Sequence, residues 1–343
     1  MENLLEVRNL TKTFQTKKGL LHAVNDITFD VRKGETLGIV GESGCGKSTT
    51  GRAVLRLVEP TSGAVRFEGK DILSYNARAM REARKDMQII FQDPFASLNP
   101  RLSISQIIAE PFDVYRMYDA KERANRVLEL MRTVGLSHRL VNAFPHELDG
   151  GRRQRVGVAR ALALNPKFIV CDEPVSALDV SIQAQILNLI QDLQQKLNLT
   201  YMFISHDLSV VKHISDRVAV MYLGKIVELT TSRKIFTNPL HPYTQALLSA
   251  IPIPKVGKKR KRIILSGDVP SPINPPKGCI FSGRCPFVMP KCKEAPPPVI
   301  EAEPEHFVSC YLISDKINPA EAGSAPSTQS SDSNGTSQNS ATA

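Results

Sequence analysis

The chain has 343 residues, of which 42% are hydrophobic and 23% are charged. This length accommodates one large domain and a smaller one, and the composition is that of a globular protein with a sizeable core. The absence of Trp, with aromatic residues at 6%, argues against a platform that stacks many nucleic-acid bases. The net charge of +10 favours anionic partners, whether nucleotide, nucleic acid or lipid surface.

No segment of the sequence has the apolar length of a membrane span. Residues 1–10 lack a basic region followed by an apolar run, so we expect no secretory signal and a cytosolic protein. In that compartment the six cysteines are expected to stay reduced or to bind metal.

The first predicted elements are residues 4–14 and 24–31, whose alternating apolar and polar side chains predict a half-exposed antiparallel layer. From there to about residue 236, strand-like and helix-like segments alternate, which predicts an α/β domain. Short apolar runs predict buried strands at 36–40, 168–171, 201–205 and 218–223. Helices are predicted at 120–134, 152–164 and 182–197.

The composition changes after residue 238. Residues 239–315 are rich in Pro and contain four of the six cysteines, which predicts a small appended domain. Residues 316–343 consist largely of small and polar residues and are predicted to be disordered. The densest basic run, 255–262, fits either a solvated linker or a contact with a membrane surface.

Residues 41–48 (GESGCGKS) match the G-x-x-x-x-G-K-[ST] pattern of a phosphate-binding loop. A predicted strand precedes them and a helix-like segment follows, which weakens the alternative of a chance match in a glycine-rich turn. Lys47 is expected to reach the β- and γ-phosphates, and the Ser48 hydroxyl to bind Mg²⁺. The nucleotide-binding residues predicted here are Ser43, Gly44, Cys45, Gly46, Lys47, Ser48 and Thr49.

Two carboxylates follow the apolar strand 168–171. Open α/β sheets bind ligands at the carboxyl ends of their strands, so Asp172 is expected to hold Mg²⁺ and Glu173 to act as the general base. Taken alone, the pair also fits a helix cap ahead of Pro174.

The segment 148–155 (LDGGRRQR) resembles the LSGGQ signature of the ABC ATPase family. Gln92 resembles the Q-loop glutamine of that family, Asp179 the D-loop aspartate and His206 the switch histidine, all in the family's order. Phe14 stands where the family places an adenine-stacking aromatic. The resemblance covers residues 4 to about 235 and implies a nucleotide-binding domain at 1–238.

The resemblance also implies the architecture and the roles within it. The expected fold is a P-loop NTPase of RecA-like type with an antiparallel β layer and a helical subdomain at about 93–163. Gln92 would contact Mg²⁺ or the attacking water, and His206 would contact the γ-phosphate and orient Glu173. Gly150 and Gly151 would cap the γ-phosphate of ATP held by a second ATPase subunit, and Asp179 would cross that dimer interface. Residues 94–101 would contact a membrane subunit.

Asp149 departs from the family pattern, which has Ser there. A carboxylate repels a phosphate oxygen to which a hydroxyl would donate, so one hypothesis is a weakened ATP site in a heterodimer of unequal sites. The alternative is a tolerated helix cap whose charge Arg152 offsets.

The segment that contains His241-Pro242-Tyr243 resembles the C-terminal region of ATPases from dipeptide, oligopeptide and nickel importers. This resemblance implies a peripheral protein on the cytoplasmic face of the membrane. It also implies two permease subunits, a second ABC ATPase and an extracytoplasmic peptide-binding protein as partners. No nucleic-acid partner is expected. The rival interpretation is a soluble or accessory ABC ATPase that acts on nucleic acid or within a multienzyme complex.

Four cysteines lie in this C-terminal region: Cys279, Cys285, Cys292 and Cys310. They lack the closely spaced C-x₂₋₄-C pairs of zinc sites, and the family resemblance points to a [4Fe–4S] cluster. Zn²⁺ or free structural thiols are the alternatives. Cys45 and Cys171 are interpreted as packing residues.

Overall fold

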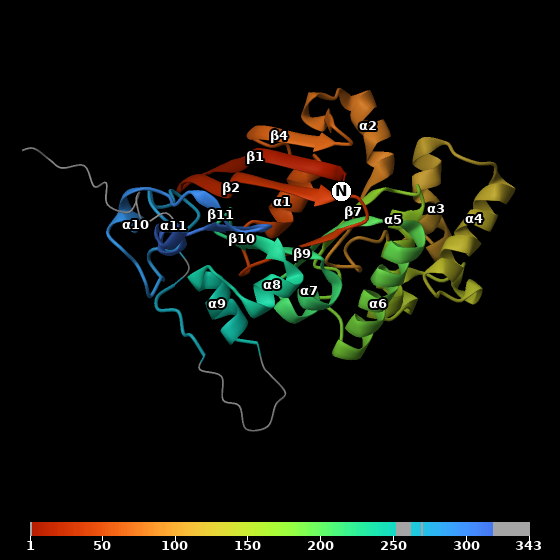
Figure 1. Cartoon of the computed structure of the whole chain (residues 1–343). Coiled ribbons are helices and arrows are strands. Elements are labelled where there is room, and N and C mark those ends of the chain that lie inside the picture. Colours follow the sequence, from red (N-terminus) through yellow and green to blue (C-terminus); the bar gives the residue numbers. More distant parts are fainter. Residues whose placement is uncertain (1, 252–261, 269, 318–343) are drawn as a thin grey trace, which may run out of the picture.

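The computed structural model describes residues 2–251, 262–268 and 270–317 (Figure 1). Five short apolar segments form the parallel part of its central sheet. These strands are β3 (Thr36–Val40), β6 (Met87–Ile90), β7 (Phe168–Asp172), β8 (Thr200–Ser205) and β9 (Arg217–Tyr222). They lie in the order β9-β3-β8-β7-β6. The four strands predicted from apolar runs are therefore confirmed, each to within one residue at either end.

Side chains of the central strands alternate between two apolar cores. In β7, Phe168 and Val170 belong to the core on one face, whereas Ile169 and Cys171 belong to the core on the other. Burial on both faces explains why these strands are continuous apolar runs without polar alternation.

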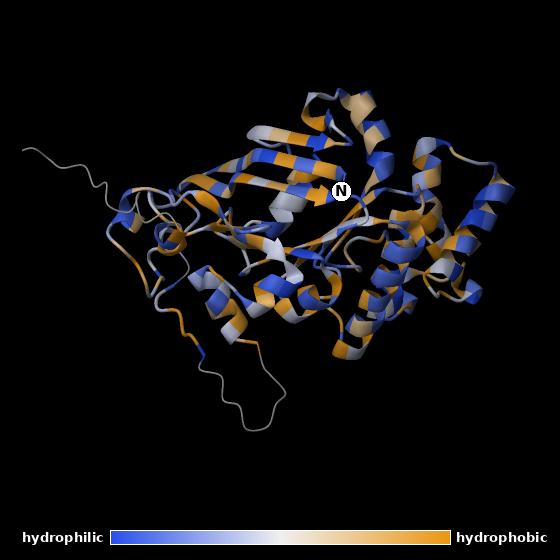
Figure 2. Cartoon of the chain, viewed as in Figure 1, coloured by the Kyte–Doolittle hydropathy of each residue, from blue (hydrophilic) through white to orange (hydrophobic). Residues whose placement is uncertain are grey.

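A second, antiparallel sheet covers one face. Its strands, in spatial order, are β2 (Gly19–Arg32), β1 (Asn3–Thr16), β4 (Ser62–Phe67) and β5 (Lys70–Asp71). Helix α1 (Lys47–Val54) packs between the two sheets, and α2 (Ala77–Asp86) follows the antiparallel sheet. Figure 2 shows the alternation of polar and apolar residues along these strands, which confirms the antiparallel layer.

The other face carries helices, and α3 and α4 extend away from the sheet (Figure 1). The helices are α3 (Ile104–Tyr115), α4 (Ala120–Thr133), α5 (Gly150–Leu162), α6 (Val180–Leu197) and α7 (Leu208–Ile214). Ser103 and Gln106 form a capping box that starts α3. The helices predicted at 120–134, 152–164 and 182–197 are present as α4, α5 and α6.

The C-terminal region joins the central sheet instead of standing apart from it. Strand β10 (Lys225–Thr231) pairs with β9, β12 (His306–Ser309) pairs with β10, and β11 (Val299–Glu303) forms the edge. The short helices of this region are α8 (Ser232–Thr237), α9 (Pro242–Ser249), α10 (Lys291–Glu294) and α11 (Tyr311–Ile317). The expectation of a small appended domain at 239–315 missed these long-range strand pairings, which composition does not encode.

Helix α11 includes residues 316 and 317, the first two of the predicted tail, and 318–343 lie outside the described residues. The basic run 255–262 also lies outside them, apart from Arg262.

A buried polar network joins the C-terminal region to β10. The Glu228 carboxylate accepts from His306 Nε2 at 2.7 Å, from Leu240 N–H at 2.8 Å and from His241 N–H at 2.9 Å. His241 is 1% exposed, and burial lowers its pKa to about 4, although Glu228 partly offsets this shift. This network gives the Cys- and Pro-rich region a polar anchor in the core.

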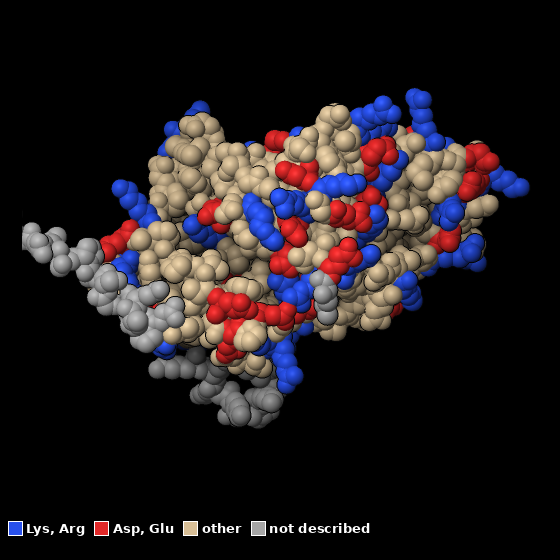
Figure 3. Space-filling view, turned by 45° about the horizontal axis from the view of Figure 1, so that its top comes forward, with Lys and Arg blue, Asp and Glu red and all other residues tan. Residues whose placement is uncertain are grey.

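Lys and Arg side chains are interspersed with Asp and Glu on the face shown in Figure 3, so that face presents no single-sign field. None of the helices in the described residues has the length and apolar character needed to cross a membrane.

Candidate active site

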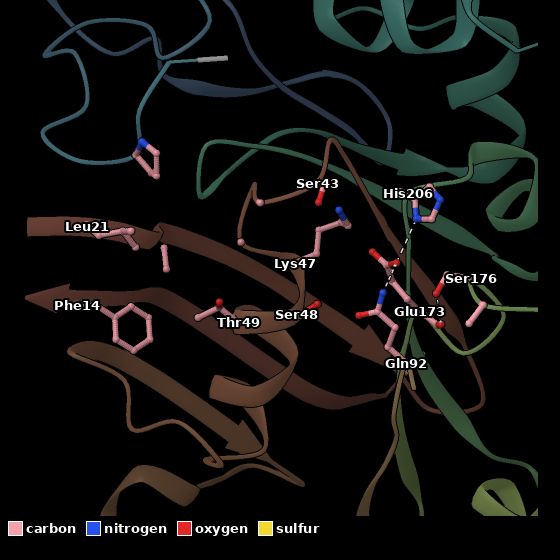
Figure 4. A pocket seen from close by; sticks show the side chains of 15 residues that line it. Phe14, Leu21, Ser43, Lys47, Ser48, Thr49, Gln92, Glu173, Ser176 and His206 are labelled. Carbon is pink, nitrogen blue, oxygen red and sulfur yellow. Dashed lines mark hydrogen bonds and ion pairs between the residues drawn. The ribbon is translucent and has the colours of Figure 1, made fainter. Parts of the chain in front are cut away.

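A cleft of about 680 Å³ opens beside the loop between β3 and α1 (Figure 4). The strand ends and loops around it supply residues from four of the predicted motifs and from the C-terminal region. The lining residues used below are Phe14, Leu21, Ser43, Gly44, Gly46, Lys47, Ser48, Thr49, Gln92, Glu173, His206 and Pro272.

The loop 41–48 turns tightly because two of its glycines adopt positive φ angles and lie so close to neighbouring backbone that a side chain would not fit. Gly46 has φ +102°, and a Cβ atom there would lie 2.0 Å from the Ala23 carbonyl oxygen. Gly41 has φ +157°, and its Cβ would lie 2.1 Å from the Met221 carbonyl oxygen. Gly46 is also the N-cap of α1, so the loop's N–H groups and the helix N-terminus favour an anion at this place.

Lys47 is 4% exposed, and its ammonium group donates to the loop's own carbonyl oxygens, to Gly41 at 2.9 Å and to Glu42 at 3.0 Å. These bonds hold the ammonium group within the loop that the sequence pattern assigns to phosphate.

The Ser48 hydroxyl donates to Asp172 Oδ1 at 2.6 Å, and Arg52 lies 3.4 Å from Asp172 Oδ2. A hydroxyl beside a buried carboxylate, with the Gln92 amide on the same cleft, is a set of hard oxygen donors that fits Mg²⁺. The structure thus brings together two residues that the sequence analysis singled out for Mg²⁺, although 124 positions separate them.

Glu173 is the centre of a three-residue arrangement (Figure 4). Its Oε2 accepts from Gln92 Nε2 at 3.1 Å and lies 3.1 Å from His206 Nδ1. The backbone of Glu173 has φ +48°, a left-handed conformation that is uncommon outside glycine and is often found at functional sites. Three residues from separate motifs are thus brought to one carboxylate.

The wall near Phe14 was only partly foreseen. Phe14 is 39% exposed and lines the cleft together with Leu21 and Pro272. Pro272 reaches this wall because its carbonyl oxygen accepts from His22 N–H at 3.0 Å, and Leu21 pairs with Ile273. The predicted alternating segment 24–31 stops short of Leu21, and no local motif announces Pro272.

The signature segment lies elsewhere. Asp149 and Gly151 line a separate cleft of about 500 Å³ together with Arg152. Gly150 begins α5 and Asp179 is the N-cap of α6, and neither lines the nucleotide cleft. Asp149 accepts from Arg152 N–H at 2.7 Å, and its carboxylate lies 3.4 Å from Arg152 Nε, so this charge is partly balanced.

The four C-terminal cysteines are free thiols that line one small cavity near α9. Burial raises the pKa of Cys279 and of Cys285, and raises the pKa of Cys310 to about 11. Across the described ranges, no three His, Cys, Asp or Glu side chains are placed to hold a single metal ion. Cys45 and Cys171 are buried, as packing residues would be, and Cys45 does not line the nucleotide cleft.

Comparison with known proteins agrees with this geometry. Residues 24–176 match the ABC transporter family, and residues 227–292 match the oligopeptide/dipeptide transporter C-terminal region. The oligopeptide transport ATP-binding protein AppF of Bacillus subtilis is 55% identical over 91% of this chain and 98% of its own length. The oligopeptide transport ATP-binding protein OppF of Salmonella typhimurium is 53% identical over 90% and 96%.

Two solved structures are also similar. The dimeric post-hydrolysis state of the ATP-binding cassette MJ0796, bound to ADP and Pi, has a TM-score of 0.61 and 28% identity over 67% of this chain and 99% of its own. The structure of cbiO1 from Clostridium perfringens has a TM-score of 0.62 and 28% identity over 69% and 92%. The chain has the P-loop ABC ATPase fold, and it belongs to the ABC transporter ATP-binding proteins that carry the oligopeptide/dipeptide transporter C-terminal region.

Proposed function

We propose that this chain is the ATP-hydrolysing subunit of an importer for di- and oligopeptides. The observation that carries the proposal is the convergence of Lys47, the Ser48–Asp172 pair and the Glu173 arrangement on one cleft. Relatives that match the chain over nearly their whole length are named as peptide transport ATP-binding proteins. They favour this function over a soluble ABC ATPase that acts on nucleic acid.

Each residue of the cleft has a task in hydrolysis. The loop N–H groups and Lys47 bind the β- and γ-phosphates, while Phe14, Leu21 and Pro272 contact the base. Ser48, Asp172 and Gln92 hold Mg²⁺, which when bound neutralises charge on the phosphate oxygens.

Glu173 accepts a proton from the attacking water. The oxygen of that water bonds to the γ-phosphorus as the bond from the γ-phosphorus to the β–γ bridging oxygen breaks. His206 and Gln92 orient that carboxylate, because both contact its Oε2 atom.

A second ATPase subunit completes each site under this proposal. The signature residues line a cleft separate from the Lys47 cleft, so the N-terminus of α5 is available to ATP bound on a partner. The hypothesis of unequal sites in a heterodimer rests on the Asp149 carboxylate at the N-terminus of α5, where it would repel the γ-phosphate of ATP on a partner.

The remaining partners are two permease subunits and an extracytoplasmic peptide-binding protein, with this chain on the cytoplasmic face of the membrane. The permease contact would include residues 94–101, where the Phe95 side chain is 54% exposed and Arg153 lies 5.0 Å from its ring centroid. An exposed aromatic ring on the helical side of the sheet is suited to such an interface.

A [4Fe–4S] cluster on Cys279, Cys285, Cys292 and Cys310 is part of the proposal. Its support is the family resemblance and the single cavity that all four thiols line. The sequence lacks the closely spaced C-x₂₋₄-C pairs of zinc sites, so we place a cluster ahead of Zn²⁺ in this proposal.

Anaerobic purification followed by visible absorption and iron and sulfide assays tests this part. We expect about four irons per chain, lost in Cys279→Ser or Cys310→Ser. A colourless protein would remove the cluster and leave the ATPase proposal standing.

The ATPase proposal is tested by uptake. A strain that lacks this chain should fail to import a labelled dipeptide or tripeptide, and Glu173→Gln should not restore import although the variant is made in normal amount. Restoration by Glu173→Gln would overturn the proposal.

A further inference from the structure

The C-terminal region holds the phosphate-binding loop at Glu42. The Arg284 guanidinium forms a two-point ion pair with this carboxylate, with Nη1–Oε2 at 2.8 Å and Nη2–Oε1 at 3.2 Å. The Glu42 N–H donates to the Tyr243 hydroxyl at 3.0 Å. The Arg284 side chain is 10% exposed and the Glu42 side chain 27%, so the pair is partly shielded from water.

Glu42 also contacts the catalytic lysine from its other side. Its carbonyl oxygen accepts from Lys47 Nζ at 3.0 Å, so a shift of Glu42 would move the ammonium group that is proposed to bind phosphate. The position of Glu42 therefore enters the free energy of nucleotide binding, although neither Arg284 nor Tyr243 lines the cleft.

Arg284 belongs to the cysteine segment, residues 278–292. Its N–H donates to the Phe281 carbonyl at 3.0 Å, and Cys279 N–H donates to the Cys292 carbonyl at 2.7 Å. A Cβ at Gly278 would lie 2.3 Å from the Cys292 carbonyl oxygen, so the two ends of the segment are closely apposed. A change in this segment is thus transmitted to the Arg284 backbone.

The same segment is packed onto the aromatic side chains beneath the loop. The Phe281 ring lies 5.5 Å from the Tyr243 ring and 5.3 Å from the Tyr222 ring. Phe281 and Tyr243 are fully buried, which leaves little room for the segment to move independently of Tyr243.

We propose that Arg284 is a positioning residue for the phosphate-binding loop. Through Arg284, the stability of the cysteine segment and the free energy of nucleotide binding are coupled. This inference rests on the proposed ATP site. Because coupling between two sites is reciprocal, nucleotide must stabilise the cysteine segment by the same factor with which the segment strengthens nucleotide binding.

The first test is a double-mutant cycle on the full chain, with the Kd for Mg-ATP measured by calorimetry. Arg284→Gln and Glu42→Gln should each weaken binding by about tenfold, and the double variant should be no weaker than either single one. Arg284→Lys should restore part of the loss, since Lys keeps the charge without the two-point geometry.

Arg32→Gln is the matched control, because Arg32 forms an ion pair between the same core and Glu305 of the C-terminal region, away from the phosphate-binding loop. Its Kd should be that of the wild type. Additive losses in the double variant, or an equal loss in Arg32→Gln, would overturn the inference.

The second test is hydrogen–deuterium exchange of the peptide that spans residues 278–292. Mg-ADP should slow exchange there in the wild type and in Arg32→Gln, but not in Arg284→Gln. If the wild type binds nucleotide and this peptide does not respond, the coupling is absent. If the wild type binds no nucleotide, the proposed function itself fails.

Discussion

In the nucleotide cleft, contacts between distant parts of the chain join residues that each belong to a short motif, whereas two C-terminal residues that contact the walls of this cleft, Arg284 and Pro272, carry no such local signal. Ser48 meets Asp172 and Gln92 meets Glu173, and each of the four could be singled out in its own segment. Pro272 lines the cleft, and Arg284 lies behind it, paired with Glu42 of the phosphate-binding loop.

The difference has a physical origin. Phosphate binding needs a glycine-rich turn ahead of a helix, and hydrolysis needs carboxylates at the end of a buried strand, so backbone geometry restricts the residue types locally. An ion pair such as Arg284–Glu42 requires only that two side chains meet, and many other residue pairs would satisfy the local backbone.

The largest expected effect is on ATP turnover at the nucleotide cleft, whose residues come from short motifs. Glu173→Gln keeps the size and the hydrogen bonds of the side chain but removes the base, so ATP turnover should fall by about 10²–10⁴-fold while Mg-ATP still binds. Single-turnover hydrolysis measures this loss. Glu129→Gln, on an exposed face of α4, is the control and should hydrolyse normally. Turnover within a few-fold of wild type in Glu173→Gln would remove Glu173 as the base.

The next effect concerns the stability that the buried His241 of the C-terminal region contributes to the fold. Since burial lowers the pKa of His241 to about 4 from an ordinary value near 6.5, the unfolded chain binds a proton there before the folded chain does. Stability from neutral His241 is thus fully present above pH 6.5 and lost as the pH falls to 4, by about 3 kcal/mol.

Denaturant unfolding between pH 7 and pH 4 measures that loss. His241→Asn retains a side chain that can cap α9 but does not titrate, so its stability should fall less steeply over this range. Parallel curves for the two proteins would show that His241 is not a buried neutral group.

A smaller effect concerns the wall of the cleft near Phe14, which is proposed to contact the base. Phe14 was predicted from the family resemblance, whereas Pro272 was not predicted. Phe14→Ala should raise the Kd for ATP by about 5–30-fold, because a lost aromatic contact costs about 1–2 kcal/mol. Phe95→Ala, whose ring is exposed on the helical side, should bind ATP normally. An unchanged Kd in Phe14→Ala would place the adenine elsewhere.

The smallest effect concerns the signature. Asp149→Ser removes a charge that Arg152 only partly balances, and it should raise ATP turnover of the assembled dimer by a few-fold. Steady-state turnover of the assembled dimer checks this. Unchanged or lower turnover would favour the interpretation of Asp149 as a tolerated cap.

Much of this fold could be predicted from the sequence, because buried parallel strands are continuous apolar runs and the antiparallel layer alternates. The four buried strands predicted from apolar runs were placed to within one residue, and Lys47, Ser48, Gln92, Glu173 and His206 do line one cleft. The attachment of β12 to β10 could not be foreseen, since this pairing joins strands that lie far apart along the chain. Pro272 was missed for the same reason.

The proposed function is tested most directly by ATP hydrolysis in proteoliposomes that contain this chain, its partner ATPase and the two permease subunits. Addition of the peptide-loaded binding protein should stimulate hydrolysis and drive peptide uptake, and both should be lost in Glu173→Gln. Hydrolysis that ignores the loaded binding protein, with no peptide taken up, would contradict the assignment of this chain to peptide import.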